Sequence, residues 1–305
     1  MKVLAYTHTF NDADVIEQMI QSFLRQTRTV DEILVVDNAS TDNTLQQPCL
    51  KHATVLRLPQ NTGTSGAICE GFRYALEQSY DWMWIFDPDG DPAPDALGKM
   101  LDLHAGWPPS QQDQTAFLSC LHPEQWRDGA LRVYTWQGLL PIKPDPEARY
   151  YPCEVAWWSG TLYRMAAVRK VGFPNPDYFA DWGEGEYGYR VKKAGFKGYV
   201  CRDATMDSNI RGYASLRPTE ITRDGTTSTV LEHPPFRCYY TARNRLYLTL
   251  YDFAEFRPVM LLRMVVTLGT MMTKIMLQPG RHGVQMRAFG RGIWHGLTGN
   301  IAARY

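Results

Sequence analysis

The sequence lacks an excess of charge of either sign. Its 305 residues include 32 lysines and arginines and 32 aspartates and glutamates, which gives a formal net charge of zero. Proteins that bind nucleic acid need a basic face that neutralises phosphates. We therefore expect no nucleic-acid partner. The share of apolar residues, 44%, predicts an ordinary globular protein with a sizeable core.

Closely spaced cysteines are also absent. The six cysteines are scattered, without the short spacings of zinc sites or of disulfide-rich domains. This pattern favours a reducing compartment. The chain runs from Met1 directly into a strand-like apolar segment, which leaves no room for a secretory signal peptide. The sequence therefore predicts a cytoplasmic protein.

Uninterrupted apolar segments of membrane-spanning length are missing as well. Residues 259–277 are mostly apolar, but Arg263 and Lys274 interrupt them, and charges inside a span are costly. We therefore predict no transmembrane helix here. Residues 278–305 carry basic and aromatic side chains and no acidic one. Such a tail can make a peripheral contact with an anionic membrane surface. The alternative is a helical tail packed on its own domain or on a second subunit of a homo-oligomer.

The first hundred residues alternate between strand and helix patterns. Short apolar runs lie at 3–6, 33–36, 54–58 and 82–86, and helical spacing of apolar residues fills the gaps between them. Such an alternation predicts an α/β fold, with a mostly parallel sheet and helices on both faces.

The pattern weakens after residue 102. Residues 103–152 are rich in proline, glutamine and tryptophan and include a hairpin-like Asp128-Gly129, which predicts partly antiparallel structure and loops. The polar stretch 211–235 is interpreted as a flexible loop. An aromatic-rich helix is expected from residue 236, followed by a helical C-terminal region.

The run Asp87-Pro88-Asp89 directly follows the apolar strand at 82–86. Open α/β sheets bind ligands at the carboxyl ends of their strands. Two carboxylates on one turn can bind a single divalent cation that also contacts phosphate oxygens. The alternative is an acidic surface turn that binds nothing.

Other polar groups follow the neighbouring strands, so we expect them at the same edge of the sheet. Thr7 and Thr9 end the first strand, Asp37 and Asn38 follow the second, and an Asn61-Thr62-Gly63 turn precedes a helix. A carboxylate such as Asp37 can accept hydrogen bonds from a base N–H or from ribose hydroxyls, and glycine lets the chain approach a ligand closely. Asp37 could instead only cap its own turn.

This order of motifs resembles the nucleotide-binding half of the family 2 glycosyltransferases, which have the GT-A fold. The turn at Ser159-Gly160 is similar to a small-residue turn that the family places near the donor sugar. Residues 179–190 resemble its acceptor-side motif, in which Glu184 takes the place of the catalytic base. The run Tyr239-Tyr240-Thr241-Ala242-Arg243-Asn244 resembles a signature of rhamnosyltransferase- and galactofuranosyltransferase-like members. The resemblance covers roughly residues 1 to 250.

The resemblance implies an inverting glycosyltransferase. Its donor would be a nucleotide-diphosphate sugar, UDP- or dTDP-linked, with rhamnose or galactofuranose favoured. Its acceptor would be a hydroxyl of a cell-surface glycan or of a lipid-linked glycan, and Mg²⁺ or Mn²⁺ would assist. It also implies a catalytic domain at 1–235, with a nucleotide-sugar half at 1–102 and an acceptor half at 103–235, and a helical region at 236–305.

The resemblance also assigns residues to each part of the site. Donor-binding residues would be Thr7, Thr9, Asp37, Asn38, Asn61, Gly63, Asp87, Ser159 and Gly160. Acceptor-binding residues would be Asp181, Trp182, Tyr240 and Arg243. Asp87 and Asp89 would hold the metal, with Asp207 substituting for a histidine that many relatives place some two dozen residues after the base.

Other interpretations stay open. Glu184 and Glu186 lie near a helix start, where acidic residues are favoured by the helix dipole. His8 and His233 are interpreted as ordinary packed or surface histidines. A nucleotidyltransferase would also place carboxylates on a nucleotide-binding sheet, but residues 7–11 lack its glycine-rich, arginine-containing loop. A non-catalytic sugar- or nucleotide-binding relative is the third alternative, against which the intact Asp87, Asp89 and Glu184 argue.

Overall fold

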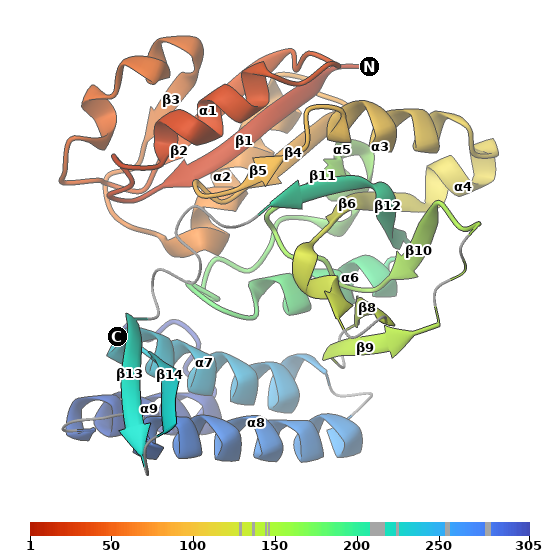
Figure 1. The fold of residues 1–305 in the computed structure, drawn as a ribbon. Helices are drawn as coiled ribbons and strands as arrows, with labels where there is room; N and C mark the ends of the chain where they lie inside the picture. Colours follow the sequence, from red (N-terminus) through yellow and green to blue (C-terminus); the bar gives the residue numbers. More distant parts are fainter. Residues whose placement is uncertain are drawn as a thin grey trace. The chain divides into compact units, whose positions relative to one another are not determined.

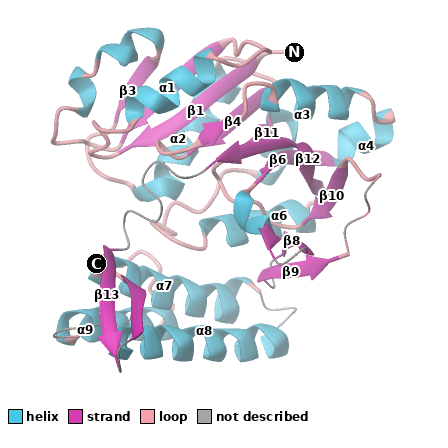
Figure 2. Ribbon diagram, viewed as in Figure 1, coloured by secondary structure: helices cyan, strands magenta, loops and turns pink. Residues whose placement is uncertain are grey.

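The computed structural model describes residues 1–127, 130–135, 138–143, 145, 147–207, 217–223, 226–253, 257–277 and 282–305. The chain divides into two compact units, drawn in Figures 1 and 2. Unit 1 comprises Met1–Pro176 and Tyr187–Ile210, and unit 2 comprises Asp177–Glu186 and Arg211–Tyr305. Unit 2 thus combines a short acidic segment from the middle of the chain with the C-terminal residues, and the predicted domain boundaries at residues 102 and 235 stay predictions.

Unit 1 is built on a nine-stranded sheet of order β10-β12-β6-β11-β4-β1-β2-β3, with β5 paired to β12. The first four strands pair in parallel, as β3-β2-β1-β4. Their bounds are β1 Val3–Thr9, β2 Glu32–Asp37, β3 Thr54–Arg57 and β4 Trp82–Phe86. The helices that alternate with or follow them are α1 Ile16–Leu24, α2 Gly63–Glu77 and α3 Ala96–Ala105, with short 3₁₀ turns η1 Thr44–Gln46 and η2 Pro48–His52.

Side chains on these strands alternate between two hydrophobic cores, one on each face of the sheet. Tyr6 and Ile85 pack with Phe72 of α2 on one face. Ala5 and Trp84 pack on the other face with residues of α1 and α3. Because successive strand residues point to opposite faces, a strand with helices on both sides must be apolar throughout. The predicted α/β fold with helices on both faces is confirmed.

The second half of the sheet is mixed. Strand β11 is antiparallel to β4 and β6, β12 is parallel to β6, and β10 is antiparallel to β12. A separate three-stranded antiparallel sheet, β7-β8-β9, confirms the antiparallel structure predicted after residue 102. The turn residues Asp128-Gly129 lie outside the described residues. The bounds are β5 Asp91–Pro92, α4 Pro109–Gln114, β6 Thr115–Leu121, η3 Pro123–Gln125, β7 Trp126–Arg127, β8 Ala130–Thr135, β9 Gly138–Ile142, β10 Tyr150–Cys153, β11 Thr161–Arg164, α5 Met165–Val171, α6 Gly183–Lys193 and β12 Lys197–Asp207.

Unit 2 is mainly helical. Its elements are the antiparallel pair β13 Arg217–Arg223 and β14 Thr226–Glu232, the helices α7 Pro235–Tyr247, α8 Arg257–Leu277 and α9 Gly283–Leu297, and a π-helical turn, η4 Leu248–Asp252. The prediction of a flexible loop over 211–235 is wrong for its described part. That part is polar but rich in threonine, and β-branched residues favour strands whether or not they are apolar.

Helices α7 and α9 approach each other closely. A Cβ atom on Gly292 would lie 2.3 Å from the backbone oxygen of Tyr239, and one on Gly296 would lie 2.8 Å from that of Arg243. The two glycines therefore set the spacing of the helix pair. By contrast, α8 leaves most of its surface open. Pro258–Leu277 is long and apolar enough to cross a membrane by length and composition, and 22% of it is buried, so the prediction that its charges exclude a span is not confirmed.

Candidate active site

The carboxyl ends of β1, β2 and β4 meet at one edge of the sheet of unit 1. Thr9 pairs with Asp37, and Thr7 pairs with Phe86, the residue before Asp87. Strand β11 runs the other way, so its first residues reach the same edge. The Gly160 N–H donates to the Ile85 carbonyl at 2.8 Å. The sheet thus brings Asp37 and Asp87 to the edge where the strand pattern predicted them, and Ser159, assigned through the family resemblance, lies at the same edge.

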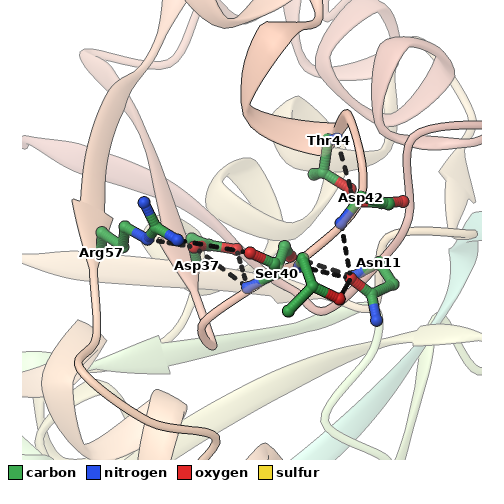
Figure 3. Close-up of polar contacts among 7 residues, drawn as sticks. Asn11, Asp37, Ser40, Asp42, Thr44 and Arg57 are labelled. Carbon is green, nitrogen blue, oxygen red and sulfur yellow. Dashed lines mark hydrogen bonds and ion pairs between the residues drawn. The ribbon is translucent and has the colours of Figure 1, made fainter.

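Asp37 ends β2 with a fully buried side chain. Its two carboxylate oxygens accept from the backbone N–H of Ser40 at 3.1 and 3.3 Å, and the Arg57 guanidinium lies 3.5 Å away (Figure 3). The Ser40 hydroxyl in turn accepts from the Asn11 N–H at 2.9 Å. Asp37 therefore does cap its turn. Its ion pair with the largely exposed Arg57 also places a charged pair at this edge of the sheet.

Asn11 holds the rest of this turn. Its side-chain oxygen accepts from the backbone N–H groups of Thr41, at 2.7 Å, and Asp42, at 3.2 Å (Figure 3). Asn11 and Ala39 both adopt left-handed backbone conformations, with φ of 60° and 65°. Such conformations are costly outside glycine and persist only when neighbouring contacts hold them. The loop after β2 is therefore fixed before any ligand binds.

Asn38 connects this loop to the turn before α2. Its side-chain oxygen accepts from the Thr62 N–H at 2.9 Å, and its amide donates to the Gly63 carbonyl at 3.1 Å. The Asn61 side chain accepts from the Gly63 N–H at 2.8 Å, and Gly63 has a φ of 73°. Three of the predicted donor-binding residues are thus joined in one network. The amide oxygen and nitrogen of Asn38 and the amide oxygen of Asn61 already have partners within the protein.

The two threonines of β1 are less available than predicted. Both are fully buried. The Thr9 hydroxyl donates to the Asp12 carboxylate at 3.0 Å, and the Thr7 hydroxyl donates to the His8 carbonyl at 3.3 Å. These contacts hold the β1 end and the start of the following loop. A direct role for either hydroxyl in donor binding stays a prediction.

Asp87 lies between two residues from other strands. Its N–H donates to the Ser159 hydroxyl at 3.2 Å, and its carboxylate lies 3.6 Å from Nε2 of His8. Sequence reasoning took His8 for an ordinary histidine. Its position between Thr7 and Thr9, at the end of the first strand, was the signal that could have placed it beside Asp87.

Asp89 carries the clearest electrostatic signature of the site. Burial, followed by the nearby charge of Asp87, raises the pKa of Asp89 to about 6. A carboxylate whose charged form is disfavoured in this way, next to a second carboxylate, is suited to a shared divalent cation, since carboxylate oxygens are ligands that Mg²⁺ and Mn²⁺ prefer. The donor set of Asp87 and Asp89 therefore fits the predicted metal.

The predicted third ligand is not gathered with them. Asp207 is exposed on β12, where it pairs with Asp91 of β5. In the part of the chain that the structure describes, no group of three histidine, cysteine, aspartate or glutamate side chains could hold a metal. Asp207 as a ligand stays a prediction. Asp87 and Asp89 leave most coordination positions for the oxygens of a bound diphosphate or water.

His122 is a residue that sequence reasoning missed. It is almost fully buried, and its Nε2 lies 2.9 Å from the Ser159 carbonyl. Burial lowers the pKa of His122 to about 4, so the ring is neutral at pH 7. It therefore supports Ser159, whose hydroxyl holds Asp87. Gly160 completes this support with a φ of 82°, and a Cβ atom there would lie 2.4 Å from the Met206 sulfur. The sequence around His122 carries no pattern that reveals this contact.

Two of the predicted acceptor-side residues, Asp181 and Trp182, lie in the segment Asp177–Glu186 of unit 2, here called the acceptor-side loop, and the other two, Tyr240 and Arg243, lie on α7. Asp181 and Trp182 both adopt left-handed backbone conformations, with φ of 64° and 67°. Helix α6 begins directly afterwards, with Glu184 and Glu186 in its first turn. Glu186 is buried, whereas Glu184 is partly exposed. Two consecutive strained residues before Glu184 are typical of a functional loop held by its surroundings.

Helix α7 supplies the contacts that hold this loop. The Asn244 amide donates to the carbonyls of Ala180 and Asp181, at 2.6 and 2.8 Å. The Thr241 hydroxyl donates to the Asp181 carboxylate at 2.6 Å. Arg243 donates to the Asp177 carbonyl at 2.6 Å and also to the Ala303 carbonyl. The motif that suggested acceptor binding is thus the part of α7 that shapes the acceptor-side loop.

Aromatic and cationic groups complete these contacts. Tyr240 stacks on Phe179 with ring centres 5.0 Å apart, and the Arg245 guanidinium lies 4.0 Å from the Trp182 ring centre. Arg243 and Tyr240 are buried. Direct contact of Tyr240 or Arg243 with an acceptor stays a prediction. Trp182 and Asp181 are partly exposed and are better placed for it.

Comparison with known proteins identifies a family. The family model described as Glycosyl transferase family 2 matches residues 6–172. A galactofuranosyltransferase of Mycolicibacterium smegmatis is 24% identical over 255 residues, which cover 81% of this chain and 82% of the relative. An N-acetylglucosaminyl-diphospho-decaprenol L-rhamnosyltransferase of Mycobacterium tuberculosis is 26% identical over 218 residues, which cover 62% of this chain and 69% of the relative.

A solved structure shares the fold. A mannosyltransferase from Pyrobaculum calidifontis, in complex with GDP-Man and Mn²⁺, matches with a TM-score of 0.55 at 15% identity. The match covers 97% of this chain and 87% of that one. The predicted GT-A fold is therefore confirmed.

Proposed function

The chain belongs to glycosyl transferase family 2 and is a glycosyltransferase, and we propose that it moves a sugar from a UDP- or dTDP-linked donor to a glycan hydroxyl with inversion of configuration. The relatives favour galactofuranose or rhamnose as the sugar. The name of the rhamnosyltransferase also favours a lipid-linked glycan as the acceptor. The cytoplasm, where nucleotide sugars are made, is the expected compartment.

The observation that carries the proposal is the carboxylate pair at the end of β4. Asp87 and Asp89 would hold Mg²⁺ or Mn²⁺, which would neutralise the charge that develops on the departing diphosphate. Burial and, to a smaller extent, the charge of Asp87 raise the pKa of Asp89, so a bound cation would stabilise the ionised form of Asp89. The Ser159 hydroxyl and the neutral His122 ring behind it hold the Asp87 backbone in place. The pair is thus preorganised for a charged ligand.

Nucleoside binding is assigned to the loops after β2 and before α2. Asp37 would accept a hydrogen bond from the base. The Arg57 guanidinium, which pairs with Asp37 in the free protein, would then contact the ligand as well. Asn11 and Asn38 would keep both loops in one shape. A loop that is already ordered loses little conformational entropy on binding.

Glu184 is assigned as the general base. It would take the proton from the acceptor hydroxyl while the hydroxyl oxygen attacks the anomeric carbon from the face opposite the leaving nucleoside diphosphate. One C–O bond forms as the other breaks, which inverts the configuration. General-base assistance typically contributes ~10²–10⁴-fold to rate. The partial exposure of Glu184 supports this choice over the buried Glu186.

A donor screen tests the proposal. Purified protein would be incubated with UDP-galactofuranose, dTDP-rhamnose and other sugar nucleotides, each with Mn²⁺ or Mg²⁺ and a lipid-linked disaccharide acceptor. We expect acceptor-dependent release of UDP or dTDP and a product with inverted anomeric configuration. Retention of configuration would contradict the assigned mechanism.

The same screen separates the alternatives. A nucleotidyltransferase would form pyrophosphate from a nucleoside triphosphate and a sugar phosphate, without needing an acceptor glycan. A non-catalytic relative would bind UDP or dTDP in calorimetry but release neither from any donor. No observation in the structure favours either one over transfer.

A further inference from the structure

Helix α8 of unit 2 has an apolar face that the described residues do not cover. Leu262, Val265, Val266 and Met276 are 68, 61, 60 and 62% exposed. At 3.6 residues per turn these four side chains fall on one side of the helix. The packed residues Met260, Met264, Met271 and Ile275 fall on the opposite side. Two opposite sides of the helix are therefore apolar, one buried and one exposed.

Exposed apolar side chains of this size are unusual on a helix that faces water. Surface helices normally carry charged or polar residues on their outer face. On α8 the two charged residues whose side chains are described, Arg263 and Lys274, flank the apolar face and do not interrupt it, since both lie close to the boundary with the packed side. The face runs from Val259 to Leu277, which is about 27 Å at 1.5 Å per residue.

Helix α9 adds exposed cationic and aromatic groups. Arg287, Arg291 and Trp294 are spaced by four and three residues, so they lie on one face of α9. All three are exposed, Trp294 by 65%. Arginine with tryptophan is the combination that favours the boundary between lipid headgroups and acyl chains.

The positive charge of the C-terminal residues favours an anionic partner. Residues 256–305 contain seven cationic side chains and no aspartate or glutamate, although the whole chain is neutral. The seven are Arg257, Arg263, Lys274, Arg281, Arg287, Arg291 and Arg304. A second copy of the chain placed against this face would bring like charges together. An anionic surface would instead be attracted to it.

We propose that α8 and α9 bind the surface of an anionic lipid bilayer, with the apolar face of α8 lying in the interface and the arginines of α9 contacting lipid phosphates. Such helices bind through buried apolar area together with attraction to anionic headgroups. A membrane-crossing α8 is disfavoured because Met271 and Ile275 would have to leave the apolar cluster of unit 2, in which they pack with residues of α7 and α9. In Figure 1, α8 runs alongside α7.

The consequence concerns substrate access. The loop Asp177–Glu186 belongs to the same compact unit as the proposed membrane-binding helices. A bilayer surface would concentrate a lipid-linked acceptor around that unit. The membrane contact itself does not depend on the proposed reaction, so it is tested without an activity measurement.

The test is co-sedimentation of the full chain with large vesicles. We expect binding to vesicles of phosphatidylglycerol and phosphatidylcholine, and at least tenfold weaker binding to phosphatidylcholine alone. Raised salt should weaken binding, because part of the attraction is electrostatic. Equal binding to both vesicle types would overturn the proposal.

Two double variants separate the apolar and the cationic contributions. Leu262→Glu with Val265→Glu should lower binding at least tenfold, and Arg287→Glu with Arg291→Glu should remove the preference for anionic lipid. The matched control is Leu24→Glu with Val55→Glu, which adds the same charge at exposed apolar positions of unit 1. An equal loss in that control would show a general charge effect and overturn the proposal. Circular dichroism spectra would confirm that all variants fold.

Two further measurements address the other occupants of this face. If α8 crosses the membrane, the protein in cell membranes will resist carbonate and high-salt washes and need detergent for release. If α8 is a contact between copies, light scattering without vesicles will show an oligomer that Leu262→Glu with Val265→Glu converts to monomer. Either result overturns the proposal, whereas release by carbonate and a monomer in solution support it.

Discussion

Two regions of the molecule are held in place in different ways. The first is the donor edge of unit 1, which carries Asp37, Asp87 and Asp89, and the second is the acceptor-side loop of unit 2, Asp177–Glu186. At the donor edge, the predicted residues lie at strand ends or in the loops that adjoin them, and contacts join these neighbouring segments, such as Asn11 with Thr41, or Asp87 with Ser159. In unit 2, Asp181 and Trp182 are strained, and the loop is held by α7, about sixty residues further along the chain. The first arrangement follows from sheet topology. The second depends on a distant helix, and the two should respond differently to mutation.

The largest effect is expected at the donor edge. Asp89→Ala should abolish transfer, by more than ~10³-fold, because Asp87 alone cannot hold the cation against the diphosphate charge. The fold should survive, since removing Asp89 also removes carboxylate repulsion. Transfer assays with Mn²⁺ and thermal melts measure both. Full activity of this variant, or of the wild type in excess chelator, would contradict the metal role.

The acceptor-side counterpart is Glu184→Gln, which keeps size and removes proton affinity. If Glu184 is the base, kcat should fall by about 10²-fold or more, while the affinity for UDP or dTDP stays near wild type. Glu186→Gln is the matched control. A larger loss at Glu186 would place the base two residues further on, and mild losses at both would leave them as helix-start charges.

Arg243→Ala tests whether the distant helix shapes the loop. The buried guanidinium bonds to the carbonyls of Asp177 and Ala303, so we expect kcat to fall between about 10- and 100-fold through a displaced Glu184. Calorimetry should give an unchanged donor affinity, and the pH profile of kcat should shift because the surroundings of the base change. A variant with raised KM for acceptor and normal kcat would indicate direct acceptor contact instead.

Asp37→Ala tests the nucleoside contact at the donor edge. Loss of a hydrogen bond to a charged group costs about 1.5–3 kcal/mol, so UDP or dTDP should bind about 10-fold more weakly or worse. Asp37→Asn, which can still accept the Ser40 N–H, separates nucleoside recognition from capping of the turn. If Asp37→Asn binds normally and Asp37→Ala does not, the residue acts only through the turn.

The smallest expected effect is that of pH on the metal. With a pKa of about 6, Asp89 is mostly ionised at pH 7 and mostly protonated at pH 5.5. The proton competes with the cation, so Mn²⁺ affinity should fall about fourfold between those values. Titration of Mn²⁺ in the presence of UDP measures it. Affinity that rises as pH falls would contradict the raised pKa.

The difference between contacts at strand ends and contacts with distant segments explains what the sequence could predict. The apolar run from Trp82 to Phe86 is the observed β4, and the parallel order of the first four strands follows from their alternation with helices. Asp37 and Asp87 could be placed because strand ends of one sheet meet at one edge, whereas Ser159 was assigned only through the resemblance to the family. Contacts between distant segments left no such pattern. His122 supports Ser159 from another strand end, and Arg243 looked like a ligand contact although it is buried.

The last three residues of the chain have a practical consequence for protein engineering. The Ala303 carbonyl accepts from Arg243, the Arg304 guanidinium lies 3.0 Å from the Asp177 carboxylate, and the Tyr305 N–H donates to the Tyr240 hydroxyl at 3.3 Å. A truncation after residue 302 therefore removes three contacts that hold α7 and the acceptor-side loop. An affinity tag is better fused before Met1, since a tag after Tyr305 would be joined directly to the contacts that hold the segment bearing Glu184.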